Sequence, residues 1–281
     1  MNHSNIILTG LPRSGSTLVC HLLNKVNNTI ALNEPMAGNF PEGATQQEIC
    51  GEIAEFFASS RQSILEKKQV LTKHIKGKVP DNSFGPEKNS SGLRTNHQME
   101  RSFIDIENEV SDNFTLCVKH NGLFALLLGE LTSFFPCYAI IRNPLAVLAS
   151  WNSVDIPVNY GHIPVAENAD RELFQALSAI PDRLDRQFHI LSWFFGQYKN
   201  TLPKEKIIRY EEVIESGGSS LKMVTSGASK LAEPLVNRNV NDLYDKALML
   251  SLGERLLNTE GEYWQFYTPE DVKSLLSKII G

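Results

Sequence analysis

The chain has 281 residues, of which 42% are hydrophobic and 21% charged, and this composition excludes disordered, collagen-like and coiled-coil proteins. Its 27 basic and 32 acidic residues give a net charge of −5, so we expect no nucleic-acid partner and only a local anion site. The longest apolar run, Leu123 to Leu128, is too short to span a membrane, and the first residues lack the pattern of a signal peptide. We therefore expect a cytoplasmic protein without a membrane span.

Four short apolar runs predict strands, each followed by a helical pattern. They are Asn5–Thr9, Phe114–Val118, Cys137–Ile141 and Lys206–Arg209. Amphipathic helical stretches are expected at 46–66, 123–134, 145–151, 182–199, 242–257 and 270–280. Strands that alternate with helices predict an α/β fold, with a mainly parallel sheet flanked by helices on both faces. We expect a single domain over residues 1–281.

The four cysteines are scattered along the chain and form no Cys-x-x-Cys motif. They are Cys20, Cys50, Cys117 and Cys137. Buried free thiols are expected.

One segment, residues 77–98, predicts a long loop, because 12 of its 22 residues are Gly, Pro, Asn, Ser or Asp. A loop of this length inside a compact domain is usually functional or mobile. Covering a substrate is one interpretation of this segment, and a disordered insertion is the other.

The segment Ile6 to Val19 predicts a strand, a glycine-bounded turn and a helix, in that order. Four residues separate Gly10 from Gly15, and Ser16 and Thr17 follow, which is the spacing of a Walker-type phosphate loop. In such a loop the backbone N–H groups and the helix N-terminus favour a polyanion, and glycine lets the backbone come close. The expected fold is therefore of the P-loop type.

Two parts of a nucleoside triphosphatase are missing from this pattern. Ser16 stands where such an enzyme has its lysine, and the cation of the loop is Arg13. The strand ends that should supply a Mg²⁺-binding carboxylate read Lys119–His120, Arg142–Asn143 and Arg209–Tyr210. A loop of this kind suits a donor whose transferred group carries less charge than a terminal phosphate, such as a sulfuryl group. No metal site is predicted.

A second candidate anion site follows the strand that ends at Ile141. Arg142 stands at the strand end. Pro144 can begin the next helix, because the first residue of a helix does not need an N–H group for an intrahelical hydrogen bond. Ser150 lies about six residues beyond Pro144, or roughly 9 Å along a helix. Arg142 and the Ser150 hydroxyl can therefore meet on one phosphate only if the chain doubles back between them.

The segments Pro12–Leu18 and Ile140–Trp151 resemble the two nucleotide-binding motifs of sulfotransferases that use 3′-phosphoadenosine 5′-phosphosulfate (PAPS). The loop is most similar to those of tyrosylprotein sulfotransferases and of bacterial carbohydrate sulfotransferases such as the trehalose enzyme. The resemblance implies that Arg142 and Ser150 bind the 3′-phosphate of PAPS and of its product PAP. It also implies that the 5′-phosphate is bound by the loop residues Arg13, Ser14, Gly15, Ser16 and Thr17.

Near the C-terminal third, Ile207–Val213 resembles the strand and helix start that follow in these enzymes. Arg238, within Leu235–Asn239, is a candidate for a further basic contact to the nucleotide. The late Gly-x-x-Gly-x-x-Lys motif of the cytosolic sulfotransferases is absent, so a surface arginine is the alternative.

Sulfuryl transfer to a hydroxyl needs a base at the acceptor oxygen and positive charge around the sulfonate. Glu34 follows Arg13 by 21 residues, about where the Arg-type sulfotransferases have a catalytic glutamate, so the resemblance implies that it is the base. Burial would raise the pKa of this carboxyl and Arg13 would lower it, and both directions stay open. Lys119 matches the family's lysine and, with Arg13, is expected to bind the sulfonate or bridging oxygen.

His120 and His74 are the alternative bases. Neighbouring strand residues point to opposite faces, so His120 is disfavoured if Lys119 faces the site. His74 is expected at the acceptor site or on the surface.

The sequence therefore predicts a sulfotransferase that moves a sulfuryl group from PAPS to a hydroxyl of a small-molecule, carbohydrate or lipid acceptor. A P-loop kinase or NTPase and a non-catalytic nucleotide-binding protein are the alternatives. The acceptor pocket is expected between Glu34–Phe40, the segment 77–98 and Ser153–Pro164. Residues that could stack on an acceptor there are Phe40, Phe84, His97, Tyr160 and His162.

Overall fold

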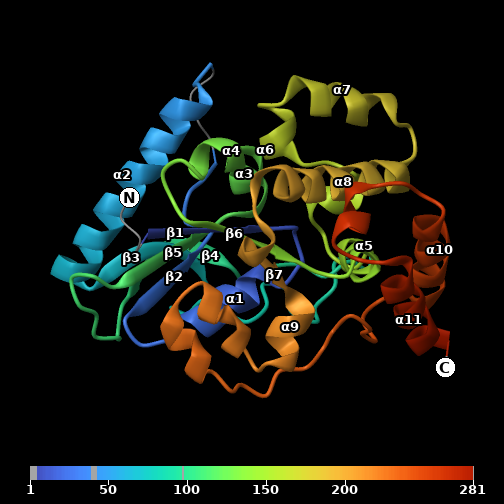
Figure 1. The fold of residues 1–281 in the computed structure, drawn as a ribbon. Coiled ribbons are helices and arrows are strands. Elements are labelled where there is room, and N and C mark those ends of the chain that lie inside the picture. Colours follow the sequence, from blue (N-terminus) through green and yellow to red (C-terminus); the bar gives the residue numbers. More distant parts are fainter. Residues whose placement is uncertain (1–4, 39–42, 97, 281) are drawn as a thin grey trace.

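Five strands form one parallel sheet in the order β2-β5-β1-β6-β7 (Figure 1). The strands are β1 (Asn5–Gly10), β2 (Thr29–Asn33), β5 (Thr115–Lys119), β6 (Cys137–Ile141) and β7 (Ile207–Arg209). The structure is a computed structural model that describes residues 5–38, 43–96 and 98–280. The prediction of an α/β fold with a parallel sheet is confirmed, and all four predicted strands are present.

Helices cover both faces of this sheet, as predicted. Helix α1 (Ser16–Leu23) and helix α9 (Tyr210–Glu215) lie on one face. The hydrophobic core on the other face takes residues from α2 (Gln46–Lys67), α3 (Asn121–Leu126), α4 (Leu128–Leu131), α5 (Pro144–Trp151) and α8 (Arg183–Thr201). It extends through α5 to α10 (Lys246–Leu257) and α11 (Pro269–Ile280), which pack on α5 and on each other. Two short helices, α6 (Pro164–Glu167) and α7 (Arg171–Ala179), join α5 to α8. No helix within the described residues is long and apolar enough to cross a membrane.

Alternation of side chains along the central strand explains the two cores. Ile7 of β1 packs into the core that contains α2 and α8, whereas Ile6 and Leu8 pack into the core that contains α1. A strand buried on both faces reads as an unbroken apolar run, which is why the sequence marks these strands clearly. The four cysteines are free and buried, as predicted.

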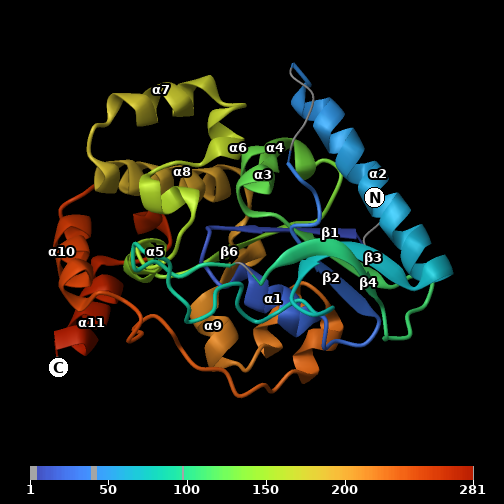
Figure 2. The same ribbon diagram turned by 180° about the vertical axis from the view of Figure 1, so that it is seen from behind.

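A two-stranded antiparallel hairpin, β3 (Gln69–His74) and β4 (Glu100–Asp105), was not among the predicted elements. Figure 2 shows the hairpin beside β2, and the Thr72 hydroxyl accepts a hydrogen bond from the Asn33 N–H at 2.9 Å. The segment 77–98 connects the two strands. The prediction of one helix over 123–134 is wrong, because the chain leaves helical geometry at Leu127, between α3 and α4.

The topology places an opening at the end of β1. After β1 the chain crosses to β2 and returns through β5, whereas β6 and β7 lie on the other side of β1. Ligands of open parallel sheets bind beyond the carboxyl ends of the strands at such a reversal of strand order. The loop that follows Gly10 begins there.

Candidate functional site

A cavity of about 700 Å³ lies beyond the carboxyl ends of the central strands. The loop after β1 supplies one wall, and the residues that follow β2, β5 and β6 supply others. The hairpin, the segment 77–98 and a stretch near Arg238 complete the lining. The cavity therefore joins parts of the chain that are far apart in sequence.

The predicted phosphate loop forms a tight turn into helix α1. Its two glycines make room for packing, because a Cβ atom on Gly10 would lie 2.7 Å from the carbonyl oxygen of Ile140. A Cβ atom on Gly15, whose φ is +92°, would lie 2.7 Å from the Tyr210 ring. Helix α1 begins at Ser16, so its first backbone N–H groups lack partners within the helix and are available to an anion.

Four of the five predicted loop residues line the cavity. They are Arg13, Gly15, Ser16 and Thr17. The Ser14 hydroxyl is buried, has no partner among the described residues and lies against Gly10, outside the cavity lining. The hydroxyl of Ser16 donates to Asn121 Oδ1 at 3.0 Å, and this hydrogen bond attaches the loop to the start of helix α3. The side chain of Ser14 is therefore not part of the anion site, and only its backbone fits the predicted role.

Arg13 is the cation of this loop, and its backbone is left-handed at φ 69°. Its Nε atom donates to the Ser150 hydroxyl at 3.2 Å and its Nη2 atom to Asn82 Oδ1 at 3.0 Å. The guanidinium lies 4.6 Å from the centre of the Phe84 ring. Burial lowers the pKa of Arg13 to about 10, but the side chain remains a cation at neutral pH.

The structure brings Arg142 and Ser150 together, although helix α5 separates them in sequence. Tyr244 joins them, because its hydroxyl lies 3.4 Å from Arg142 Nη2 and interacts with the Ser150 hydroxyl. Burial raises the pKa of Tyr244, but Arg142, Ser150 and Arg13 together outweigh burial and lower it. Ser150 itself is fully buried and is not part of the cavity lining, so it is linked to Arg142 through Tyr244 and Arg13.

Most Arg142 donors already bind the protein. The guanidinium donates to Asn239 Oδ1 at 2.8 Å, to the Arg13 carbonyl at 3.0 Å and to the Arg238 carbonyl. Arg142 therefore holds the phosphate loop and the segment at Arg238 in place beside the cavity. The exposed Arg238 side chain also lines the cavity, where it was predicted as a nucleotide contact.

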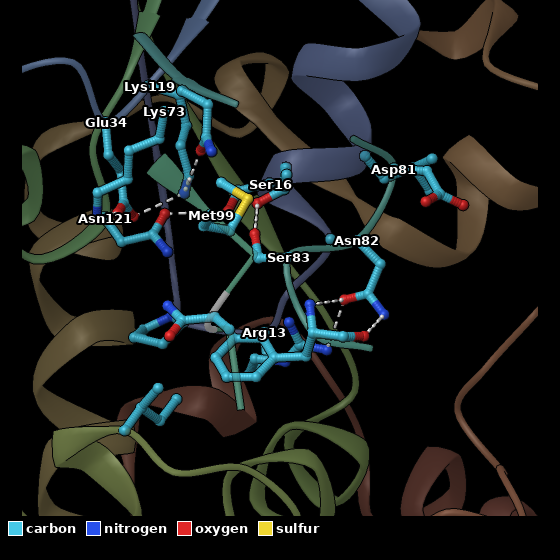
Figure 3. A pocket seen from close by; sticks show the side chains of 18 of the residues that line it. Arg13, Ser16, Glu34, Lys73, Asp81, Asn82, Ser83, Met99, Lys119 and Asn121 are labelled. Carbon is cyan, nitrogen blue, oxygen red and sulfur yellow. Dashed lines mark hydrogen bonds and ion pairs between the residues drawn. The ribbon is translucent and has the colours of Figure 1, made fainter. Parts of the chain in front are cut away.

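Glu34 lies between two lysines at the other end of the cavity (Figure 3). Its Oε1 atom is 2.8 Å from Lys119 Nζ, and its Oε2 atom is 2.7 Å from Lys73 Nζ. Burial raises the pKa of this carboxyl, but the charges of Lys119, His120 and Lys73 outweigh burial and hold it well below its usual range. Glu34 is therefore a carboxylate at neutral pH, with a left-handed backbone at φ 44°.

The two alternative bases have different surroundings. His120 follows strand β5 and lines the cavity together with Lys119, so the expectation that they point apart is wrong. Burial lowers the pKa of His120 to about 4, and its buried Nδ1 has no partner among the described residues. His74 is buried in the hairpin, where its ring bonds Ser102 at 2.7 Å and the Gly77 N–H at 3.1 Å. It is therefore neither a surface residue nor part of the cavity lining.

The predicted acceptor pocket is assembled in part. Glu34, the segment 81–84 and the segment 156–165 contribute to the same cavity, and His162 is among its lining residues. Phe84 packs on Arg13 instead of standing free. Tyr160 is 47% exposed and is not part of the lining. Phe40 and His97 lie outside the described residues.

The segment 77–98 lies against the phosphate loop. Asn82 bonds Arg13 (Figure 3). The Ser83 hydroxyl lies 3.4 Å from the Thr17 hydroxyl. The Val79 carbonyl lies 3.0 Å from His21 Nδ1 on helix α1. This part of the segment is therefore packed on the loop and does not form an independent insertion.

Lys73, Arg94 and Tyr244 are among the cavity residues that sequence reasoning missed. Lys73 lies on strand β3, whose sequence from Gln69 to His74 does not alternate between apolar and polar residues. Nothing in the local pattern marks Arg94 or Tyr244, because their role depends on contacts with distant residues. Within the described residues, no group of three or more His, Cys, Asp or Glu side chains is arranged to hold a metal ion.

No protein-family model matches this chain, and no curated protein is significantly similar to it.

Proposed function

We propose that the protein is a sulfotransferase that moves a sulfuryl group from PAPS to a hydroxyl group of an acceptor. One observation carries the proposal: the loop after β1, Arg142 and the Glu34–Lys119 pair line one cavity, and the buried Ser150 hydroxyl accepts a hydrogen bond from Arg13 of the same lining. Two anion sites at one end suit a donor with two phosphate groups, and an ionised carboxylate at the other suits proton transfer.

The 5′-phosphate of the donor would bind at the N-terminus of α1, where the amides of the loop and the charge of Arg13 favour an anion. The 3′-phosphate would bind beside Arg142 and Ser150. This second site is what distinguishes PAPS and PAP from ATP, whose ribose carries no 3′-phosphate.

Glu34 would accept the proton of the acceptor hydroxyl. The acceptor oxygen bonds to sulfur as the bond from sulfur to the bridging phosphate oxygen breaks, and PAP leaves with the electron pair. Lys119 and Arg13 would stabilise the charge that develops on the bridging oxygen and the sulfonate.

The Glu34–Lys119 ion pair links donor binding to the strength of this base. Lys119 is the largest of the positive influences that lower the Glu34 pKa. If Lys119 turns to the bound donor, burial then raises that pKa, and the carboxylate becomes a better proton acceptor. The base would thus be strongest when the donor is bound.

Calorimetric titration of the protein with PAP and with ATP, each with and without Mg²⁺, tests the proposal. We expect PAP to bind without Mg²⁺ and ATP to bind more weakly. Tight binding of Mg²⁺-ATP with no preference for PAP would overturn the proposal in favour of a kinase or NTPase. If PAP binds as expected, hydroxyl acceptors are then screened with PAPS for turnover.

A further inference from the structure

Arg94 is a buried arginine that belongs to none of the sequence motifs. Its side chain is only 3% exposed, although it lies in the segment 77–98. The Arg94 N–H donates to the Ser153 carbonyl at 3.1 Å, and its own carbonyl accepts from the Asp155 N–H at 2.9 Å. These bonds attach this part of the segment to the chain that leaves helix α5.

The Arg94 guanidinium has hydrogen-bonding capacity that the protein does not use. Within the described residues it makes one side-chain hydrogen bond, from Nη2 to the Ser153 hydroxyl at 2.8 Å. Its buried Nε atom has no acceptor among the same residues. A guanidinium carries five donors, and buried donors without acceptors are destabilising. Because Arg94 lines the cavity, a bound ligand can supply the missing acceptors.

Hydrogen bonds connect Arg94 to the second anion site. The Ser153 hydroxyl, which accepts from Arg94, donates to the Ser150 carbonyl at 2.8 Å. The Ser150 hydroxyl in turn accepts from Arg13 at 3.2 Å. Arg94 is therefore anchored at the same helix end as Ser150.

Positive charge accumulates at this end of the cavity, where four arginines lie close together. Burial lowers the pKa of Arg13, Tyr244 raises it, and the charges of Arg94, Arg142 and Arg238 lower it further. None of these four arginines forms an ion pair with a carboxylate in the part of the chain that the structure describes. Arg94 and Arg142 are buried and Arg13 is partly buried, so an anion bound among them would offset the repulsion between their charges.

We propose that Arg94 binds the 3′-phosphate of the donor together with Arg142 and Ser150. The planar guanidinium matches a phosphate group, with two parallel hydrogen bonds to its oxygens. Most N–H groups of the Arg142 guanidinium already donate to protein atoms, whereas Arg94 has N–H groups without a protein acceptor that can bind the phosphate. This inference rests on the proposed function, because it assigns a residue to the donor of that reaction.

The test compares two nucleotides that differ only in the 3′-phosphate, PAP and adenosine 5′-monophosphate. Dissociation constants for both are measured by calorimetry on the wild type, Arg94→Gln and Arg94→Lys. Lys88→Gln is the matched control, because it removes one positive charge from an exposed side chain of the same segment. Thermal unfolding of each variant shows whether it is folded at the temperature of the titration.

We expect Arg94→Gln to weaken PAP binding by about ten- to a hundred-fold and to leave the monophosphate unchanged. Arg94→Lys should recover part of the loss, and Lys88→Gln should match the wild type. Equal weakening of both nucleotides, or no weakening of either, would overturn the role of Arg94. A wild type that does not prefer PAP over the monophosphate would instead overturn the proposed function, and Arg94 with it.

Discussion

Glu34 shows how one side chain depends on its neighbours for its charge. Its carboxylate is 23% exposed and contacts two lysines, one of which, Lys119, is only 3% exposed. Removing the negative charge of Glu34 leaves the buried ammonium without its partner, which costs more than breaking a surface ion pair. The proposed catalytic role and the stability of the fold therefore depend on the same residue.

We expect Glu34→Gln to reduce turnover with PAPS by about 10²- to 10⁴-fold, because the amide cannot accept the acceptor's proton. PAP affinity should stay near that of the wild type, since Glu34 lies away from the phosphate loop. The free energy of unfolding should fall by about 1 to 3 kcal/mol. Steady-state rates, calorimetry and urea unfolding measure the three quantities. Glu107→Gln, an exposed change of the same kind, is the control, and a normal rate in Glu34→Gln would move the base to His120 or elsewhere.

His120 should make the free energy of unfolding depend on pH. Its pKa is lowered from the ordinary 6.5 to about 4, so the unfolded chain takes up a proton at a higher pH than the folded protein. Stability should be complete above about pH 6.5 and fall by about 1 to 3 kcal/mol as the pH decreases to about 4. Glu34, whose pKa is depressed, should add its loss only below its unfolded value near 4.5.

Urea unfolding between pH 4 and 7 measures this dependence. His120→Gln removes the titrating ring and should flatten the profile between pH 4 and 6.5. The same slope in His120→Gln and in the wild type would show that other groups titrate in this range.

At the scale of single elements, the loop and helix at the start of the chain show why particular glycines are needed. Gly15 caps α1 with φ +92° and faces the Tyr210 ring at a distance that leaves no room for a Cβ atom. Gly51 lies within α2 and is exposed, and a Cβ atom added there would meet no described atom within 4 Å. The two positions therefore predict opposite results for the same substitution.

We expect Gly15→Ala to destabilise the fold by about 1 to 3 kcal/mol, because alanine is strained at positive φ and also meets Tyr210. It should also weaken PAP binding, since the loop must shift. Gly51→Ala should stabilise by about 0.5 to 1 kcal/mol, because it removes a glycine from a helix interior. Urea unfolding of the two variants checks both signs. A neutral Gly15→Ala would mean that the loop relaxes freely around a side chain.

At the scale of the whole molecule, the cavity gathers positive charge in a protein whose net charge is −5. The site is built from the loop after β1, the ends of β5 and β6, the segment 77–98 and the stretch near Arg238. A nucleotide that contacts all of these parts stabilises their arrangement, because it binds the folded state alone.

PAP should therefore raise the unfolding free energy by about 2.7 kcal/mol when its concentration is a hundred times its dissociation constant. Its affinity should decrease as salt is raised, since the arginine cluster attracts the nucleotide electrostatically and salt screens that attraction. Thermal unfolding and calorimetry over a series of salt concentrations measure both effects. PAP binding that is indifferent to salt would argue against binding at the arginine cluster.

Local pattern was enough to predict much of the fold. The continuous apolar runs of β1, β5 and β6 and the two glycines of the phosphate loop are local features, since strand period and turn geometry depend on neighbouring residues. Arg13, Lys119 and Arg142 could be named because each stands at a predicted strand end or in the glycine-bounded turn, whereas Glu34 was named from the family resemblance. The hairpin went unpredicted, because the residues of Gln69–His74 do not alternate between apolar and polar side chains and their alternating burial appears only in the structure.

The tertiary structure alone decided the partners of these residues and their charges. Lys73 is 39 positions from Glu34 along the chain, and Arg142 is 97 from Asn239, so no spacing rule connects them. The direction of the Glu34 pKa depends on burial against two nearby ammonium groups, a balance that only their distances set. The sequence by itself determined four strands of the parallel sheet, several of the helices and the position of the glycine-bounded turn after β1. Folding determined which side chains share the cavity, because contacts between distant segments depend on how the strands are ordered in the sheet.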